Sequence, residues 1–386
     1  MFRTVVAGLA RAVGRAGGAW AQAPFRIGVV LPMTGPSQST GKQIDAAMKL
    51  YMQEHGSVVA GHPVELILRD DAGVADTTRR LTQEFIVRDK VNAIAGFGLT
   101  PLAMAAAPLA TQAKVPMMVI GAGTSSVTTQ SPFIVRTGQT LPQPAVAMAD
   151  WAVQNGVKAV VTLVSDYGPG FDAEKFFSDR FRQGGGEVLA NLRAPLANPD
   201  FAPFLQRAMD ARPAALFTFV PSGFGAVLAK QFVERGLDKS GVRLIATGDV
   251  TDDDQLNGMG DAVLGMVTSG PYSTAHPSEV NRAFVAAFEK ANPAMRPNFM
   301  AVFGYDALHV LFSALQKTQG DLDGAGLVEA MKGFAWESPR GPAMIDAQTR
   351  DIVQNIYIRK VERQDGQLYN VEFASFPMMK DPGKAK

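Results

Sequence analysis

The segment Gly-Ala-Gly-Thr-Ser-Ser, from Gly121 to Ser126, is the part of the chain best suited to bind a small acid. It follows an apolar run, and its small residues allow the backbone to approach a ligand closely. Two backbone N–H groups and the Thr124 hydroxyl can donate hydrogen bonds to a carboxylate. We therefore expect the ligand's acid group at Ala122, Gly123 and Thr124. The alternative is an ordinary tight turn between a strand and a helix.

A dinucleotide site is a weaker interpretation of the same glycines. The third glycine of the Gly-x-Gly-x-x-Gly pattern is replaced by Ser126, and no acidic residue ends a following strand at the usual distance. The chain also lacks the Gly-Lys-Ser/Thr of a phosphate-binding loop. We therefore expect no cofactor.

The patterns of catalytic and metal-binding sites are missing as well. Ser222 lies in Pro-Ser-Gly-Phe-Gly, which lacks the glycine two positions before the serine of a nucleophile elbow. His55, His62, His276 and His309 have no metal-ligand spacing. The acidic runs Asp70–Asp71 and Asp252–Asp254 are interpreted as helix caps or solvated charge. The sequence therefore favours a binding protein over an enzyme and predicts no metal site.

Apolar runs of strand length alternate with segments of helical periodicity, and these elements must position the turns. The first unit, Phe25–Glu54, combines an apolar strand, a Gly/Pro/Ser/Thr-rich turn and a helix. Such alternation predicts parallel βαβ units, in which small molecules bind at the carboxyl ends of the strands. Strands are expected at Ile27–Leu31, Val64–Leu68, Ala93–Ala95, Met117–Ile120, Ala159–Val164, Ala215–Val220, Leu244–Ala246 and Val263–Val267. Helices are expected at Gly41–Gln53, Asp76–Arg88, Pro101–Gln112, Gln143–Gln154, Asp172–Gln183, Phe201–Asp210, Phe224–Arg235, Val280–Ala291 and Ala301–Lys317.

Three breaks in this alternation divide the chain into four pieces. They lie at residues 136–142, 270–277 and 338–342. If the first and third pieces share one sheet and the second and fourth share another, the result is two α/β lobes with a ligand cleft between them. We predict a first lobe of residues 24–138 and 274–338 and a second lobe of residues 139–273 and 339–386. In the last piece, Asp365-Gly366 between two apolar strands predicts a β-hairpin.

The composition limits the class of protein. The chain has 386 residues, of which 47% are apolar, and this suffices for a large core and more than one domain. Its 37 Lys and Arg residues nearly balance 36 Asp and Glu residues, so nucleic acid and membrane surfaces are not expected partners. The absence of Cys excludes a thiol nucleophile, disulfides and thiolate metal sites.

Residues 1–23 have the organisation of a secretory signal peptide. A basic start is followed by a stretch rich in Val, Ala, Leu and Gly and then by Ala21-Gln22-Ala23. We predict export, with cleavage near Ala21 or Ala23. No later stretch is expected to approach the roughly 20 uninterrupted apolar residues of a membrane span, so the mature protein should be soluble.

Five segments, in order, resemble the type I periplasmic binding proteins, specifically the Leu/Ile/Val-binding branch that serves ABC importers. They are IGVVLPMTGPSQSTG, RDDAGVADTTRRLTQEFIVRDKVNAIAG, VPMMVIGAGTSSVT, VSDYGPGF and FGYDALHVL. The resemblance covers almost the whole mature chain. It implies two Rossmann-like lobes, joined by three crossover segments, that close by a hinge on a small ligand. It also implies a periplasmic location, ABC transporter permease subunits as partners, a monomer, and no chemistry on the ligand.

The resemblance places the ligand contacts on the turns that follow the strands. The matching positions are Ser39, Thr40, Leu99, Thr100, Tyr167, Ser222, Phe224 and Asp249, in addition to residues 122–124. Ser39, Thr40 and Thr100 could instead cap helices, as is also predicted for Asp76 and Asp172. Tyr167 either covers the ligand with its ring or belongs to the core.

Two positions depart from the amino-acid binders of this family. Those proteins have a glutamate in the last turn, which pairs with the ligand's ammonium, whereas this chain has Gly248-Asp249. In the first turn, Thr40 replaces an aromatic residue. Asp249 could salt-bridge an ammonium, bond a ligand hydroxyl or cap the helix that follows.

These departures favour a small organic carboxylate without an amine, either aromatic or aliphatic, as the ligand. A branched-chain amino acid is the alternative ligand. A cytoplasmic amide-type sensor or regulator on the same fold, and a ligand-binding partner of a separate signalling receptor, are the alternative functions.

Overall fold

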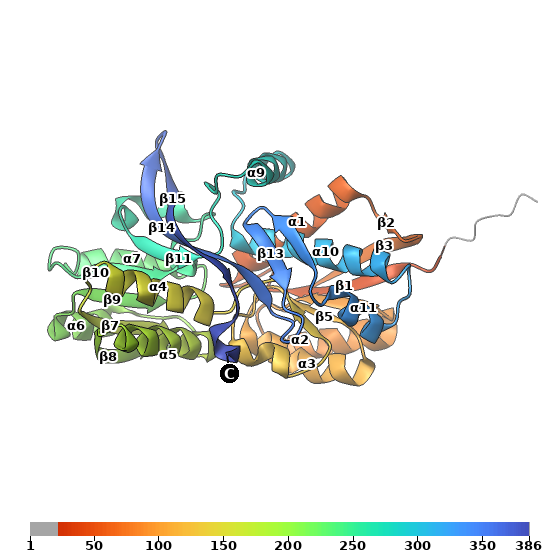
Figure 1. The fold of residues 1–386 in the computed structure, drawn as a ribbon, viewed down its shortest axis with the longest axis horizontal. Helices are drawn as coiled ribbons and strands as arrows, with labels where there is room; N and C mark the ends of the chain where they lie inside the picture. Colours follow the sequence, from red (N-terminus) through yellow and green to blue (C-terminus); the bar gives the residue numbers. More distant parts are fainter. Residues whose placement is uncertain (1–21, 386) are drawn as a thin grey trace, which may run out of the picture.

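The computed structural model describes residues 22–385. The expected signal peptide, 1–23, and its cleavage position Ala21 therefore lie outside the described residues, apart from Gln22 and Ala23. The described chain is a mixed α/β structure with two sheets of mostly parallel strands, which lie side by side (Figure 1). This architecture confirms the predicted fold class.

The first sheet has six strands in the order β2-β3-β1-β4-β5-β6. Neighbouring strands are parallel except β2 and β3. The central strand β1 is buried along nearly its whole length, as expected for a parallel strand that helices cover on both faces. The strands are β1 (Phe25–Leu31), β2 (Val58–Val59), β3 (His62–Asp70), β4 (Ala93–Gly96), β5 (Met117–Val119) and β6 (Ile134–Arg136).

The second sheet has nine strands in the order β12-β13-β14-β11-β10-β9-β7-β8, and β15 also pairs with β14. Strands β7 to β11 form its parallel part, and the last four strands are antiparallel. The strands are β7 (Ala159–Ser165), β8 (Glu187–Ala194), β9 (Ala215–Phe219), β10 (Arg243–Thr247), β11 (Val267–Gly270), β12 (Ala335–Ser338), β13 (Gly341–Ile345), β14 (Ile352–Gln364) and β15 (Gln367–Met379).

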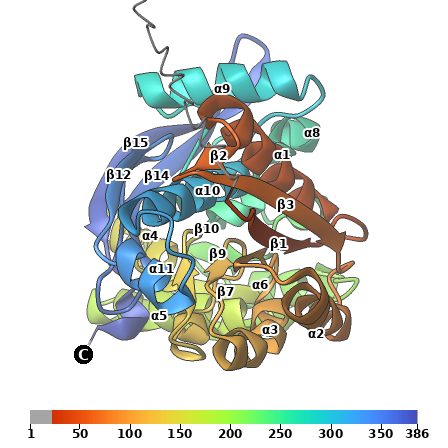
Figure 2. The ribbon, with the colours of Figure 1, turned by 90° about the vertical axis from the view of Figure 1, so that its right-hand side faces the viewer.

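Helices cover both faces of each sheet. On the first sheet, α1 (Gln38–His55) and α10 (Phe299–Lys317) pack on one face, and α2 (Ala75–Glu84) and α3 (Thr100–Ala113) on the other (Figure 2). On the second, α4 (Pro142–Gln154) and α5 (Gly168–Gln183) lie opposite α6 (Ala202–Ala211) and α7 (Gly225–Glu234). Three further α-helices are α8 (Leu256–Met259), α9 (Glu279–Ala291) and α11 (Gly324–Met331). A π-helical turn at Phe85–Asp89 follows α2, and 3-10 helices lie at Ser125–Thr129, Gly248–Thr251, Gly260–Val263 and Pro382–Lys384.

The chain passes between the sheets three times, before α4, before α9 and before β12. Helices α9, α10 and α11 return to the first sheet, where α10 packs against α1. The predicted lobe boundaries stay a prediction. They assign β12 to the first lobe, whereas in the structure β12 pairs with β13 in the second sheet.

The C-terminal hairpin and one missing strand illustrate where local sequence signals succeed and fail. Strands β14 and β15 are joined by Asp365 and Gly366, whose φ values of 49° and 81° suit a type I′ turn, so the hairpin prediction is confirmed. The strand expected at Val263–Val267 is wrong. Residues 260–263 form a 3-10 helix, and β11 begins only at Val267.

The predicted helix caps are wrong. Helix α1 begins at Gln38 and α3 at Thr100, so Ser39, Thr40 and Thr100 lie inside helices rather than before them. Asp76 is the second residue of α2. Asp172 lies within α5, where its carboxylate accepts a hydrogen bond of 2.7 Å from the Ser125 N–H. These polar side chains are therefore available for tertiary contacts.

Helix α10 is the most apolar of the long helices that the structure describes. By length and composition it could cross a membrane, although Asp306 and His309 interrupt its apolar residues. Of its most apolar window, 78% is buried inside the protein, against α1 and the first sheet. Its hydrophobicity is therefore accounted for by its place in the core.

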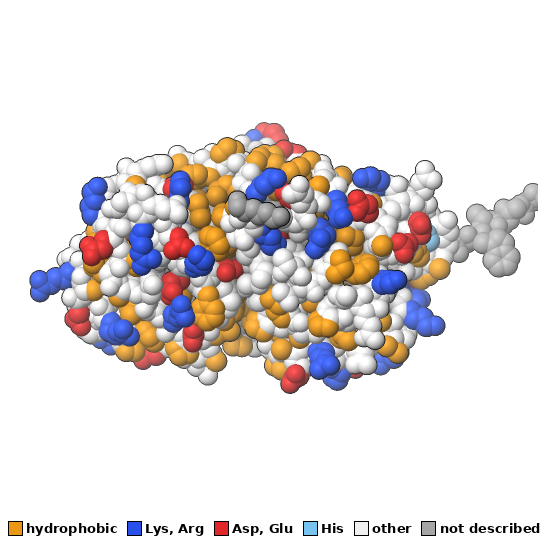
Figure 3. All heavy atoms as spheres, turned by 60° about the horizontal axis from the view of Figure 1, so that its bottom comes forward, with side chains coloured by type: hydrophobic (Ala, Val, Ile, Leu, Met, Phe, Trp, Pro, Cys, Tyr) orange, Lys and Arg blue, Asp and Glu red, His pale blue; other side chains and the backbone are white. Residues whose placement is uncertain are grey.

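The surface carries charges of both signs. On the face shown in Figure 3, Lys and Arg side chains are interspersed with Asp and Glu, and a notch separates the two halves of the molecule at one edge. This distribution agrees with the near balance of 37 basic and 36 acidic residues in the sequence.

Buried arginines hold the three crossing segments in place. Arg340, at the third crossing, contacts the Asp306 carboxylate of α10 at 2.7 Å and donates to the Thr137 carbonyl of the first crossing at 2.7 Å. Arg136, at the first crossing, pairs with Asp351 at 3.0 Å. Arg359 of β14 donates to the backbone carbonyl of Tyr272, at the second crossing. Burial lowers the pKa of both Arg340 and Arg359, so their positive charges depend on these partners.

Replacement of Arg340 should strongly destabilise the protein. In Arg340→Met, Asp306 keeps its bonds from Trp336 and Ser338 but loses the buried cation that pairs with it, and we expect a loss of about 3–5 kcal/mol of unfolding free energy in urea. Arg282→Met is the matched control, because it removes an exposed pair with Glu279 and should cost less than about 1 kcal/mol. Equal losses in the two variants would contradict this role for Arg340.

Candidate functional site

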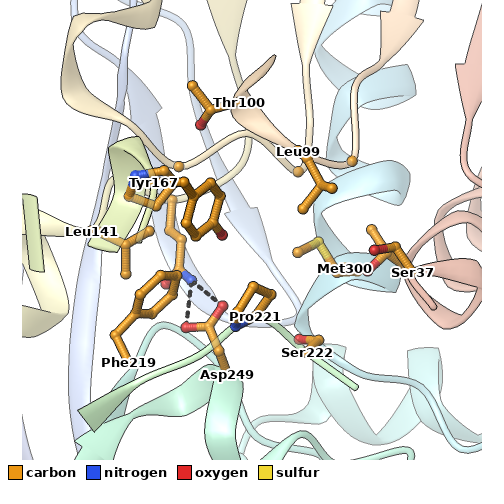
Figure 4. Close-up of a pocket in the computed structure, with 16 residues that line it drawn as sticks. Ser37, Leu99, Thr100, Leu141, Tyr167, Phe219, Pro221, Ser222, Asp249 and Met300 are labelled. Carbon is orange, nitrogen blue, oxygen red and sulfur yellow. Dashed lines mark hydrogen bonds between the residues drawn. The ribbon is translucent and has the colours of Figure 1, made fainter. Parts of the chain in front are cut away.

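A pocket lies between the two sheets, where the carboxyl ends of their parallel strands meet (Figure 4). Turns after strands of both sheets line it, as the topology of parallel sheets requires. The pocket therefore brings together segments that are far apart in the sequence.

Seven of the eleven residues predicted for the site line this pocket. They are Thr40, Leu99, Thr100, Gly123, Tyr167, Ser222 and Asp249. The other four, Ser39, Ala122, Thr124 and Phe224, lie beside it. Ala122 is buried in the core of the first sheet, and Phe224 precedes α7 and packs against the core of the second sheet.

Thr124 lies directly behind the pocket wall. Its hydroxyl is 2.9 Å from the hydroxyl of Thr100, which does line the pocket. It also packs against Gly168 at the start of α5, where an added Cβ would lie 2.6 Å from the Thr124 Oγ1. Thr124 thus supports Thr100 and touches the second half of the molecule at Gly168, where a larger side chain would force Thr124 to shift.

Ser39 joins the two halves. Its hydroxyl donates to the carboxylate of Asp254, which follows β10 in the second half. Nearby, the Asn298 side-chain amide, at the start of α10, donates to Asp252 at 3.0 Å. Asp252 and Asp253 are each only 1% exposed, so the interpretation of this acidic run as solvated charge is wrong. Burial raises the pKa of Asp252 and Asp254, which face each other's charge.

Asp249 is the acidic group that lines the second-sheet end of the pocket. It lies inside the 3-10 helix Gly248–Thr251 rather than at its start, so the capping interpretation is wrong. Its carboxylate accepts hydrogen bonds from the Thr247 hydroxyl at 3.0 Å and from the Gln139 side-chain amide at 3.3 Å. Burial raises the pKa of Asp249 to about 6, although these hydrogen bonds and the positive charge of Arg359 act to lower it. At pH 7 it is therefore mostly an anion that lacks a direct cationic partner among the contacts the structure describes.

Tyr167 and Phe219 form an aromatic wall. Their rings are stacked with centroids 6.0 Å apart and planes inclined by 20°. Burial raises the pKa of the Tyr167 hydroxyl well above its usual range, and the charge of Asp249 adds to this effect. The hydroxyl therefore stays protonated and can donate a hydrogen bond at neutral pH.

Several lining residues were missed by the sequence analysis. They are Ser37, Gln139, Leu141, Pro169, Phe219 and Met300. Gln139 and Leu141 follow β6, which has only three residues and was not recognised as a strand. Had it been recognised, the rule that sites follow strands would have found both. Met300 comes from the start of α10, where no local signal indicates a site.

One buried polar atom of the pocket, the Gln139 side-chain carbonyl Oε1, lacks a hydrogen-bond partner within the described residues. Because buried polar atoms are costly when unpaired, it is a candidate for contact with a ligand. Within residues 22–385, no group of three His, Asp or Glu side chains is arranged to hold a metal ion.

Comparison with known proteins places this geometry in a family. The periplasmic binding protein family model matches residues 24–367. A Leu/Ile/Val-binding protein homolog 6 from Brucella abortus (strain 2308) is 43% identical, over 93% of this chain and 93% of its own.

Two solved structures are also similar. A solute-binding protein of an ABC transporter from Rhodopseudomonas palustris BisB5, in complex with 3,4-dihydroxybenzoic acid, is 61% identical, with a TM-score of 0.92 over 94% of this chain and 99% of that chain. A solute-binding protein from R. palustris in complex with 4-hydroxybenzoate is 39% identical, with a TM-score of 0.90 over 94% and 99%.

These matches span the two sheets and the pocket between them, and they confirm the resemblance noted in the five sequence segments. The family and these structural neighbours are transport proteins that bind solutes. The chain therefore belongs to the type I periplasmic binding proteins, in the branch of the Leu/Ile/Val-binding proteins, and is a solute-binding protein of an ABC transporter.

Proposed function

We propose that this protein binds a hydroxylated benzoate-type acid between its two sheets and delivers it to an ABC permease. The observation that carries the proposal is the order of groups along the pocket. Hydroxyl and backbone donors lie at the first-sheet end, aromatic and apolar side chains in the middle, and the carboxyl of Asp249 at the second-sheet end (Figure 4). A hydroxybenzoate has the complementary order of carboxylate, ring and hydroxyl donor.

The first-sheet end is suited to the ligand's carboxylate. Thr100 is the first residue of α3, so its hydroxyl lies at the positive end of the helix dipole. Gly121 and Gly123 line the same end and have no side chain to keep a carboxylate from their backbone. Neutral donors of this kind can bind an anion without a buried cation.

The middle of the pocket is suited to a flat ring. Tyr167 and Phe219 present aromatic surface, and Leu99, Leu141 and Met300 supply apolar side chains. Aromatic rings stack favourably in offset geometry, and apolar walls gain from excluding water. Thr40 stands where amino-acid binders of the family carry an aromatic residue, so a ring has more room here.

The second-sheet end is suited to a hydrogen-bond donor on the ligand. The Asp249 carboxylate is buried and can accept a hydrogen bond from a phenolic hydroxyl. Neither group has to gain or lose a proton for this bond to form. A branched-chain amino acid is the second candidate, because the same carboxylate would also pair with an ammonium. The Brucella relative is named for Leu, Ile and Val, whereas the two Rhodopseudomonas proteins hold hydroxybenzoates.

Hinge closure follows from where the ligand's partners lie. A ligand that touches Thr100 and Asp249 together makes more contacts when the halves are closed than when they are open, so it stabilises the closed form. The bonds from Ser39 to Asp254 and from Asn298 to Asp252 would form in the same movement. We further propose that the protein is exported to the periplasm, with cleavage near Ala21 or Ala23, and acts as a monomer.

A ligand panel separates the two candidates. A hydroxybenzoate present at 100 times its Kd should stabilise the purified protein by about 2.7 kcal/mol, because it binds only the folded state, and should raise Tm accordingly. Differential scanning fluorimetry with 4-hydroxybenzoate, benzoate, leucine and isoleucine measures this. A rise in Tm with leucine but with neither aromatic acid would replace the proposal with the amino-acid alternative.

The Thr100 hydroxyl should contribute to carboxylate binding. Thr100→Val keeps the shape but removes the hydroxyl, and we expect binding of 4-hydroxybenzoate to weaken by about 1–3 kcal/mol in isothermal titration calorimetry. Thr111→Val, at the far end of the same helix, is the control and should leave Kd unchanged. An unchanged Kd in Thr100→Val would place the carboxylate elsewhere.

Asp249 should determine the preference for a hydroxyl on the ring. In Asp249→Ala, the affinity for 4-hydroxybenzoate should fall by about 1.5–3 kcal/mol, the value of a hydrogen bond to a charged group, while benzoate should bind nearly as well as before. Calorimetric Kd values for both acids in both proteins provide the comparison. Parallel losses for the two acids would show that Asp249 supports the fold of the site rather than the ring hydroxyl.

A further inference from the structure

Gln139 carries a buried acceptor that no protein group satisfies. The side chain is 6% exposed and lines the pocket. Its amide nitrogen donates to both carboxylate oxygens of Asp249, at 3.3 and 3.5 Å, and these are the dashed lines in Figure 4. An amide that turns its NH₂ group to a carboxylate must direct its oxygen elsewhere, because the opposite orientation would set two acceptors against each other. The Oε1 atom is left without a partner within the described residues.

The backbone of Gln139 is held from behind. Arg136, itself fully buried, donates to the Gln139 backbone carbonyl at 3.4 Å and to the Thr124 carbonyl at 2.7 Å. Because the side chain is also 6% exposed, its oxygen has little access to water. An orphaned buried acceptor costs stability unless a ligand or a water supplies a donor.

Two acceptors thus lie next to each other at one end of the pocket. One is the carboxylate of Asp249, and the other is the oxygen of the amide that is hydrogen-bonded to it. A single ring hydroxyl satisfies one of them. Two hydroxyls on adjacent ring carbons are also neighbours, and each can donate to one acceptor.

We propose that Gln139 is a specificity-determining residue that, together with Asp249, selects aromatic acids with two adjacent hydroxyls over acids with one. The inference rests on the proposed function, since it requires an aromatic acid in the pocket with its carboxylate at Thr100. In that orientation the hydroxyl opposite the carboxylate donates to Asp249, and its neighbour donates to the Gln139 Oε1. The Ser222 hydroxyl lines the same pocket.

The experiment measures Kd by isothermal titration calorimetry for benzoate, 4-hydroxybenzoate and 3,4-dihydroxybenzoate. The wild-type protein should bind the dihydroxy acid at least about tenfold more tightly than the monohydroxy acid, because the second hydroxyl satisfies an otherwise unpaired buried acceptor. In Gln139→Met, which has a similar length and no acceptor, the ratio between these two Kd values should fall to about one. Gln154→Met, on the exposed end of α4, is the matched control and should keep the wild-type ratio.

The outcomes distinguish this inference from the proposed function. Equal affinity of the wild-type protein for the two hydroxylated acids overturns the role of Gln139 but leaves an aromatic-acid binder. A ratio that survives in Gln139→Met also overturns it. If none of the three acids binds and leucine does, the proposed function falls and this inference falls with it. The wild-type ratio does not depend on any variant, so the test holds even if Gln139→Met folds poorly.

Discussion

A buried guanidinium must be paired, and this requirement shapes the junction between the two halves of the protein. Arg136, Arg340 and Arg359 are each at most 1% exposed, and together they reach all three segments that cross between the sheets. Arginine stays charged even where burial lowers its pKa, so each must meet carboxylates, carbonyls or amide oxygens in fixed geometry. Each of the three crossings is therefore anchored by at least one buried contact of an arginine.

One of these arginines also helps to position the residues of the binding pocket. Arg136 holds the backbone carbonyls of Thr124 and Gln139, whose side chains contact residues at the two ends of the pocket. Thr124 contacts Thr100, and Gln139 contacts Asp249. A single buried side chain therefore helps to position both the groups assigned to a ligand's carboxylate and those assigned to its ring hydroxyls. Pre-organisation of this kind lowers the cost of ordering the site when a ligand enters.

The sequence predicted the fold well because burial of parallel strands leaves a clear pattern. Runs such as Ile27–Leu31 and Ala159–Val164 are apolar on both faces. In the helices between such strands, apolar residues recur every three to four positions. Helix caps were predicted wrongly because a Ser, Thr or Asp near a helix start has the same local signature whether it caps or makes a tertiary contact, as Asp172 does with Ser125. In the site, Thr40, Thr100 and Tyr167 follow long or well-marked strands. Gln139 follows a strand of three residues, and Met300 reaches the pocket from a helix far along the chain, so neither has a local signal.

Because α10 packs on the first sheet, that sheet can be fully covered only late in the synthesis of the chain. One face of the first sheet is covered by a helix that ends at Lys317, although its central strand starts at Phe25. A growing chain therefore has these strands and α1 long before it has α10, and one apolar face of its first sheet stays only partly covered until most of the polypeptide exists. Contacts of such large separation in sequence form slowly. The N-terminal half should consequently stay open to chaperones and to passage through a translocation pore while the rest of the chain is being made.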